Sequence, residues 1–157
     1  MSNTMQTAFD RVESHRKSIV AGDAPVRPGQ PQTTHGLSPN DVVAQGDLYV
    51  RVRDAREKIP AGYERAIRRQ LVPGNEDGAQ HVLSNTDGVE TWFPPNWATN
   101  LDSLVGPIIV VGDVDLVIEH KGRRGHGPVT LCAGESYEIG YQRVWDAEAR
   151  VERRARD

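Results

Sequence analysis

Three histidines that are far apart in the sequence could meet in the folded chain. His81 lies inside one predicted strand, His120 ends another, and His126 follows a glycine-rich connection. Imidazole nitrogens are common ligands of transition metals, and Glu119 could add a fourth ligand. No His-x-His or HExxH spacing encodes such a site locally. A metal site at His81, His120 and His126 therefore requires the strands to converge, and ordinary histidines of a sheet are the alternative.

Cations gather on the connection between His120 and His126. Lys121, Arg123 and Arg124 alternate there with glycines, which let the backbone approach a ligand closely. These three side chains could bind a phosphate or a carboxylate. A solvated loop without a ligand has the same composition, so both interpretations stay open.

The sequence carries no familiar catalytic constellation. It has no Walker loop, no GxGxxG, no nucleophile elbow and no CxxC pair. Cys132 is the only cysteine, which excludes an internal disulfide and a cysteine-only zinc site. We therefore predict no catalytic residue, and no cofactor apart from a metal ion at the histidines.

The elements that must position these residues are mainly β-strands. Apolar and alternating runs occur at 105–111, 114–120, 128–131 and 136–145. The Gly-Asp pair at 112–113 predicts a hairpin between the first two runs, and the short turns predict an antiparallel meander. The predicted core positions on these runs are Val114, Leu116, Ile118, Tyr137, Ile139 and Tyr141.

Three further strands are expected earlier in the chain, at 42–53, 79–83 and 89–93. Together with the later runs they predict a mainly β body over residues 41–146. The expected form is a small antiparallel β barrel or sandwich, with an N-terminal helical arm and a short C-terminal helix.

The N-terminal arm is predicted from a narrow apolar stripe. The helical spacing of this stripe fits docking on a protein partner, and its residues are Met5, Phe9, Val12 and Ile19. Residues 23–40 contain four prolines and little to bury, which predicts a linker. Residues 1–40 thus form an arm that either folds back on its own sheet or docks on another subunit.

The last residues, 147–157, predict an Arg-rich helical tail. Ala147, Val151 and Ala155 recur at every fourth position, and arginines late in a helix suit its dipole. The acidic residues nearly cancel the arginine charge, which favours a solvated tail over an RNA-binding arm.

Aromatic residues lie beside two prolines at 92–97. Trp92, Phe93 and Trp97 could form a stacking surface for a partner, or they could plug one end of a small β barrel. Both interpretations follow from the same residues, so the sequence leaves them open.

Length and charge limit the class of protein. The chain has 157 residues, with 19 Lys and Arg against 22 Asp and Glu. This balance argues against nucleic-acid binding, because no basic excess neutralises phosphates. No apolar run reaches the ~18 residues that span a membrane, and no signal peptide is evident. We expect a soluble protein that is made and kept in a cytoplasm, without a membrane partner.

Several short segments occur together in a recognisable order. They are QGDL at 45–48, AQHVL at 79–83, EH at 119–120, HGP at 126–128, and QRVWD at 142–146. The chain resembles a group of small β-rich proteins from bacteria and phages, whose segments read QGD, GHxH, HxEHxP and GxYxVxxQREYD. The resemblance covers roughly residues 44–157. It implies a phage or prophage context, but Ala79 replaces one histidine of the group's GHxH segment.

Two functions from different classes follow. The first is a phage-associated structural or interaction protein, such as a capsid decoration or accessory virion protein that binds a larger lattice as a homo-oligomer. The second is a cupin-like metal-dependent enzyme or small-ligand binder that uses His81, His120 and His126. Metal analysis of the purified protein would separate them.

Overall fold

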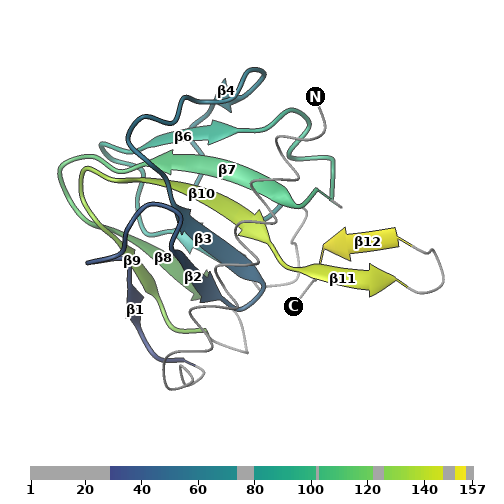
Figure 1. Cartoon of the computed structure of the whole chain (residues 1–157), viewed down its shortest axis with the longest axis horizontal. Helices are drawn as coiled ribbons and strands as arrows, with labels where there is room; N and C mark the ends of the chain where they lie inside the picture. Colours follow the sequence, from purple (N-terminus) through teal and green to yellow (C-terminus); the bar gives the residue numbers. More distant parts are fainter. Residues whose placement is uncertain (1–28, 74–79, 102, 122–125, 147–150, 155–157) are drawn as a thin grey trace.

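A computed structural model describes residues 29–73, 80–101, 103–121, 126–146 and 151–154. Within these ranges the chain forms β-strands and no helix (Figure 1). The strands are β1 Gln32–Thr33, β2 Val42–Gln45, β3 Leu48–Val52, β4 Glu64–Arg65, β5 Gln80–Leu83, β6 Glu90–Phe93, β7 Val105–Val110, β8 Leu116–Lys121, β9 Val129–Leu131, β10 Ser136–Tyr141, β11 Arg143–Asp146 and β12 Val151–Arg154.

Two sheets make up the body. One has the strand order β2-β3-β10-β7-β6-β4, and the other has the order β1-β9-β8-β5. All paired strands of the body are antiparallel except β1 and β9, which are parallel. The predicted mainly β class is confirmed, and the two sheets do not close into a barrel.

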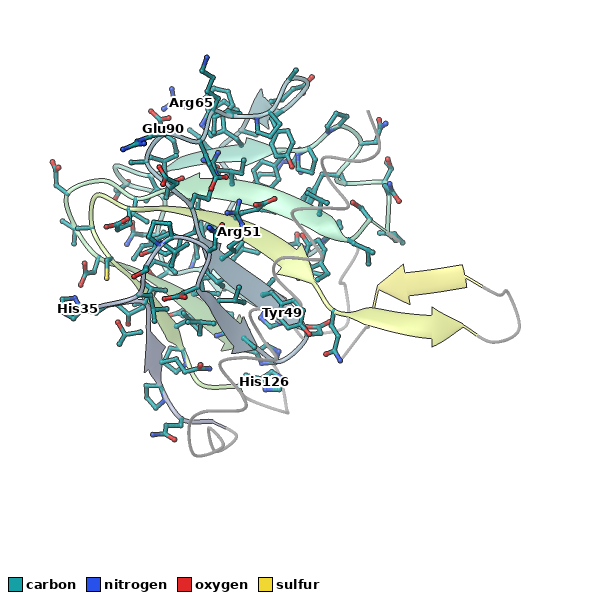
Figure 2. The ribbon with its side chains drawn as sticks, viewed as in Figure 1. His35, Tyr49, Arg51, Arg65, Glu90 and His126 are labelled. Atoms are coloured by element: carbon teal, nitrogen blue, oxygen red, sulfur yellow. The ribbon has the colours of Figure 1, made fainter. Side chains whose placement is uncertain are left out.

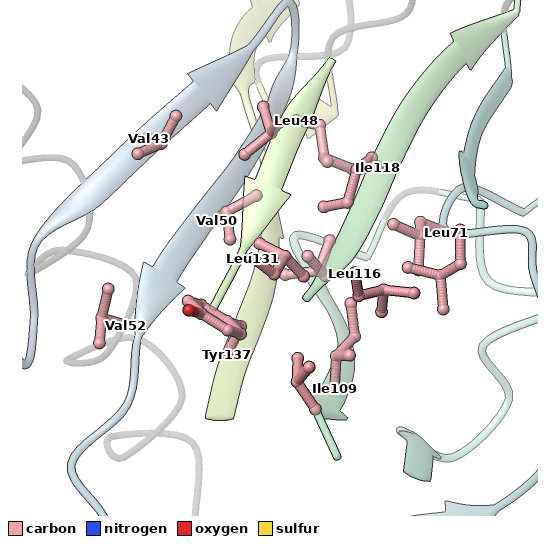
Figure 3. Packing of buried hydrophobic residues seen from close by; sticks show 14 of the residues in the cluster. Val43, Leu48, Val50, Val52, Leu71, Ile109, Leu116, Ile118, Leu131 and Tyr137 are labelled. Carbon is pink, nitrogen blue, oxygen red and sulfur yellow. The ribbon is translucent and has the colours of Figure 1, made fainter. Parts of the chain in front are cut away.

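The larger of two buried apolar clusters joins the two sheets (Figure 3). Alternate residues of β3 and β10, together with Ile109 of β7, meet residues of β8 and β9, as expected when two amphipathic sheets bury their apolar faces. Five of the six predicted core residues are almost fully buried. The exception is Val114, which is 77% exposed because it lies in the turn before β8 rather than within that strand.

The predicted hairpin over 105–120 is wrong. β7 pairs with β6 and β10, whereas β8 pairs with β5 and β9 in the other sheet. The turn after β7 therefore carries the chain between layers. Gly112 permits this crossing, because a Cβ there would lie 2.2 Å from the carbonyl oxygen of Gly88. The predicted meander fails for the same reason.

The expected long strand at 42–53 is a hairpin instead. β2 and β3 pair around a two-residue turn at Gly46 and Asp47. Gly46 has φ +59°, which a glycine at the first turn position adopts without strain. This turn places Asp47 within hydrogen-bond distance of His81 on β5 of the other sheet.

The ends of the chain differ from the predictions where the structure describes them. Residues 1–28, including the predicted helical stripe, lie outside the described residues. The predicted linker contains β1, whose Gln32 amide donates to the Pro128 carbonyl. The predicted C-terminal helix is wrong at Val151–Arg154, which pairs with β11 as β12. A short helix is marginal in water, whereas strand pairing satisfies the backbone groups of β11 as well.

No helix among the described residues is long and apolar enough to cross a membrane.

Candidate functional site

The three histidines converge. His81 on β5 and His120 on β8 are directly opposite each other in the ladder, so their side chains share one face. Their ring centroids lie 4.6 Å apart, and the ring of His126 lies 4.7 Å from that of His120. His126, labelled in Figure 2, precedes β9 at the lower end of the sandwich. The strands thus bring together residues that are 45 positions apart in the sequence.

A buried polar network holds His81 in place. Its Nδ1 lies 2.8 Å from Oε1 of Gln45, and its Nε2 lies 3.1 Å from Oδ1 of Asp47. Gln45 Nε2 donates to the carbonyl oxygens of Ile118 and Gly127, at 3.1 and 2.8 Å. His81, Gln45 and Asp47 are 2%, 1% and 7% exposed. The network therefore links both sheets through one imidazole.

Gln45 and Asp47 were not predicted as site residues. In the sequence the two residues stand on either side of a turn glycine, Gly46. Polar residues at a turn are common, however, so this position does not mark them as site residues. The predicted fourth ligand, Glu119, neighbours His120 on β8 and so faces the other side of the sheet. The carboxylate in contact with His81 is that of Asp47.

Metal binding stays a prediction. Across the described ranges, no three side chains of His, Cys, Asp or Glu already stand in the arrangement of a metal site. The imidazoles of His81, His120 and His126 pack edge to face instead, with interplanar angles of 66° and 68° between neighbours. What the structure provides is three imidazoles and one carboxylate within a single polar cluster.

The aromatic segment lies mostly inside the molecule. Phe93 and Trp97 are each 5% exposed, and their rings meet edge to face at 4.7 Å. Trp97 Nε1 donates to the Tyr141 hydroxyl at 3.1 Å. Both side chains are buried, but the two sheets do not close into the barrel that these residues were expected to plug. Only Trp92, which is half-buried, remains available to a partner.

The described residues include only one of the three cations of the predicted anion site. Lys121 is exposed at the end of β8. Arg123 and Arg124 lie outside the described residues, as do Met5, Phe9, Val12 and Ile19. Anion binding by the loop and docking by the apolar stripe stay predictions.

A second buried charge lies on β3. Arg51, labelled in Figure 2, is 4% exposed. It binds Glu57 through two hydrogen bonds of 2.9 and 2.8 Å and also contacts Glu138. Burial acts to lower the pKa of Arg51, but the two carboxylates outweigh burial and raise it. The hydrogen bonds from Arg51 lower the pKa of Glu57 to about 2. This cluster is a structural ion network rather than a site open to ligands.

The C-terminal hairpin stands apart from both sheets. β11 and β12 form their own two-stranded sheet, which extends away from the body at the right of Figure 1. The chain leaves β10 through Gln142, whose backbone N–H donates to the Asp47 carbonyl at 2.8 Å. The hairpin therefore begins beside the polar cluster.

No protein-family model, curated protein or solved structure matches the chain.

Proposed function

We propose that the chain is a non-enzymatic interaction protein, an accessory or decoration protein of a phage virion. It binds a larger protein lattice through the β11–β12 hairpin, together with the β body and the N-terminal arm. The observation that carries the proposal is the hairpin, which extends from the body as a separate two-stranded sheet.

An isolated two-stranded hairpin is marginally stable at best in water. A hairpin that extends from its own domain gains stability when another surface covers it or when another strand joins its edge. Strand addition of this kind gives affinity through backbone hydrogen bonds. A protein lattice offers the same edge many times, and a symmetric oligomer would match such repetition.

The phage context rests on the resemblance of residues 44–157 to bacterial and phage proteins. The near-neutral balance of 19 basic and 22 acidic residues fits a protein partner better than a nucleic acid. The protein would be made in the host cytoplasm and carried into the virion.

The test compares three forms of the protein in cells that produce the particles. The full chain should copurify with particles at a fixed ratio to the major capsid protein, measured by quantitative mass spectrometry. A chain ending at Gln142 keeps every strand of both sheets and loses only the hairpin and the tail. It should stay folded by circular dichroism and disappear from the particles.

The matched control is Val114→Ser, which changes an exposed apolar residue in a turn of the body. This variant should copurify as the full chain does. Recovery of the full chain only in the particle-free lysate would contradict a virion role. Retention of the folded 1–142 chain on particles would show that the hairpin is not the binding element.

A further inference from the structure

The last strand of the six-stranded sheet has an open edge. β4 pairs with β6 on one side, and no strand among the described residues pairs with its other side (Figure 1). The pairing with β6 continues through Ala66, whose backbone N–H donates to the Thr91 carbonyl at 3.0 Å. Successive residues of a strand point their N–H and C=O groups to opposite sides, so Arg65 and Ile67 direct theirs away from β6. The outer edge of β4 is therefore a template for a further strand.

The side chains along this edge do little to block such a strand. Natural edge strands are commonly protected by lysine or proline, and residues 64–68 contain neither. Ile67 is 85% exposed, and it is one of only two large hydrophobic side chains that are exposed within the described ranges. The charged residues of the segment, Glu64, Arg65 and Arg68, include both signs. A strand that joins this edge would bury Ile67 and meet charges of both signs.

We propose that the β4 edge pairs with the β4 edge of a second copy of the chain. The two strands run antiparallel around a two-fold axis at Ala66, so that the two six-stranded sheets become one continuous sheet. In this register Glu64 lies opposite Arg68 of the second copy, and the symmetry makes this contact twice. Arg65 lies opposite Ile67 of the second copy, so the outward backbone groups of both residues exchange hydrogen bonds.

Charge selects this register over its neighbours. An axis at Arg65 would place two guanidinium groups opposite each other, and an axis at Glu64 would do the same with two carboxylates. An axis at Ile67 would place Arg65 opposite Arg69 of the second copy. Like charges directly opposite each other destabilise strand pairing, whereas opposite charges stabilise it. Of these registers, the one centred on Ala66 alone brings opposite charges together.

The face that carries Arg65 also suits this pairing. Arg65 lies opposite the half-buried Trp92 in the ladder with β6, so the two side chains share one face of the sheet. Its Nη2 lies 3.5 Å from Oε1 of Glu90, and both residues are labelled in Figure 2. Because Glu90 of the same chain balances the guanidinium charge, the alkyl part of Arg65 is left to cover Ile67 of the second copy. β4 is separate from the β11–β12 hairpin, so this pairing is independent of particle binding.

The test measures the mass of the full chain by sedimentation equilibrium over a range of protein concentrations. The contact is small, so a weak monomer–dimer equilibrium is expected, with monomer in dilute solution. Hydrogen exchange at the amides of Arg65 and Ile67 should be slower in concentrated than in dilute solution. Ile67→Lys should raise the dimer dissociation constant about tenfold or more, because it places a lysine opposite Arg65 of the second copy. Val114→Lys is the matched control, since it changes the other exposed large hydrophobic residue and should leave the dimer unchanged.

A charge exchange tests the register. Arg68→Glu places carboxylates opposite each other and should weaken the dimer about tenfold, as should Glu64→Arg. The double variant carrying both changes restores opposite charges and should dimerise as the wild type does. A folded wild-type chain that stays monomeric at every concentration would overturn the proposal, as would a dimer that Ile67→Lys leaves intact. Failure of the folded double variant to regain the affinity lost in the single variants would overturn the register at Ala66.

Discussion

Glu57 illustrates how a single side chain can make stability depend on pH. Its carboxylate is two-thirds covered and accepts two hydrogen bonds from the buried Arg51. These bonds lower the pKa of Glu57 from 4.5 to about 2. The folded state therefore holds the ionised form more strongly than the unfolded state does.

We predict that Glu57→Gln lowers the free energy of unfolding by about 1–2 kcal/mol at pH 7, less than for a fully buried charged hydrogen bond. The stabilising effect of Glu57 is complete above pH about 4.5 and is lost as the pH falls toward about 2. Urea unfolding at several pH values should therefore show the two proteins converging over that window.

Glu64→Gln serves as the control, because it removes an exposed carboxylate with no ion pair in the described part of the chain. A difference between wild type and Glu57→Gln that persists unchanged at pH 2 would contradict the role assigned to Glu57.

The Tyr141 hydroxyl connects three segments of the core. It accepts from Trp97 Nε1 at 3.1 Å and donates to the Leu71 carbonyl at 2.5 Å. We predict that Tyr141→Phe costs about 1–3 kcal/mol of unfolding free energy, because it leaves a buried donor and a buried acceptor without this partner. Chemical denaturation measures the change.

Tyr63→Phe makes the same chemical change at a buried tyrosine whose hydroxyl forms no hydrogen bond with any described residue. It should change stability by a few tenths of a kcal/mol at most. Equal losses in the two variants would mean that the hydrogen bonds of Tyr141 contribute little.

At the scale of elements, β1 belongs to the body although it lies in a proline-containing segment. Gln32 donates its side-chain amide to the Ala44 carbonyl at 2.7 Å, and the Thr34 hydroxyl lies 2.7 Å from that of Tyr137. The backbone amides of both residues also donate to the β9 segment. The segment therefore joins β9 to the six-stranded sheet.

We predict that deleting residues 1–38 lowers stability by about 2–4 kcal/mol relative to deleting residues 1–28, because about four hydrogen bonds of roughly 1 kcal/mol each are lost. Thermal and urea unfolding of the two truncated chains give the comparison. Matching stabilities would mean that β1 is not held to β9 in solution.

Local pattern predicted the strands well and their partners poorly. Alternation at 136–141 and the apolar run at 105–110 mark β10 and β7, because burial of one or both faces leaves a direct sequence signal. Strand pairing depends on the direction in which the chain leaves each turn. The Gly112-Asp113 turn is compatible with a connection between the two sheets as well as with a hairpin. Residues 151–154 show the same limit of sequence patterns. Apolar residues at every fourth position predicted a helix there, but these residues form a strand that pairs with β11.

The site was predictable only for residues with distinctive chemistry. Histidines are few, so their convergence was a reasonable hypothesis from sequence. Gln45 and Asp47 join this cluster only because the β2–β3 turn lies against β5, a long-range contact that the sequence pattern does not reveal. A glutamine and an aspartate beside a glycine carry no pattern that separates a buried polar cluster from an ordinary turn.

At the scale of the whole molecule, one core is shared by the two sheets. Leu48 and Tyr137 of the six-stranded sheet belong to the same buried cluster as Ile118 and Leu131 of the four-stranded sheet (Figure 3). Neither sheet can separate without exposing both halves of that cluster to water. The body should therefore unfold as a single cooperative unit.

Native-state hydrogen exchange tests this cooperativity. The slowest amides of β8 and of β10 should share one opening free energy, equal to the global value from urea unfolding. The amides of β11 and β12 should exchange much faster in the isolated chain, because their sheet has only two strands. A lower opening energy for β8 than for β10 would divide the body into two units. Slow exchange in β11 and β12 without any partner would remove the physical reason for assigning the hairpin to partner binding.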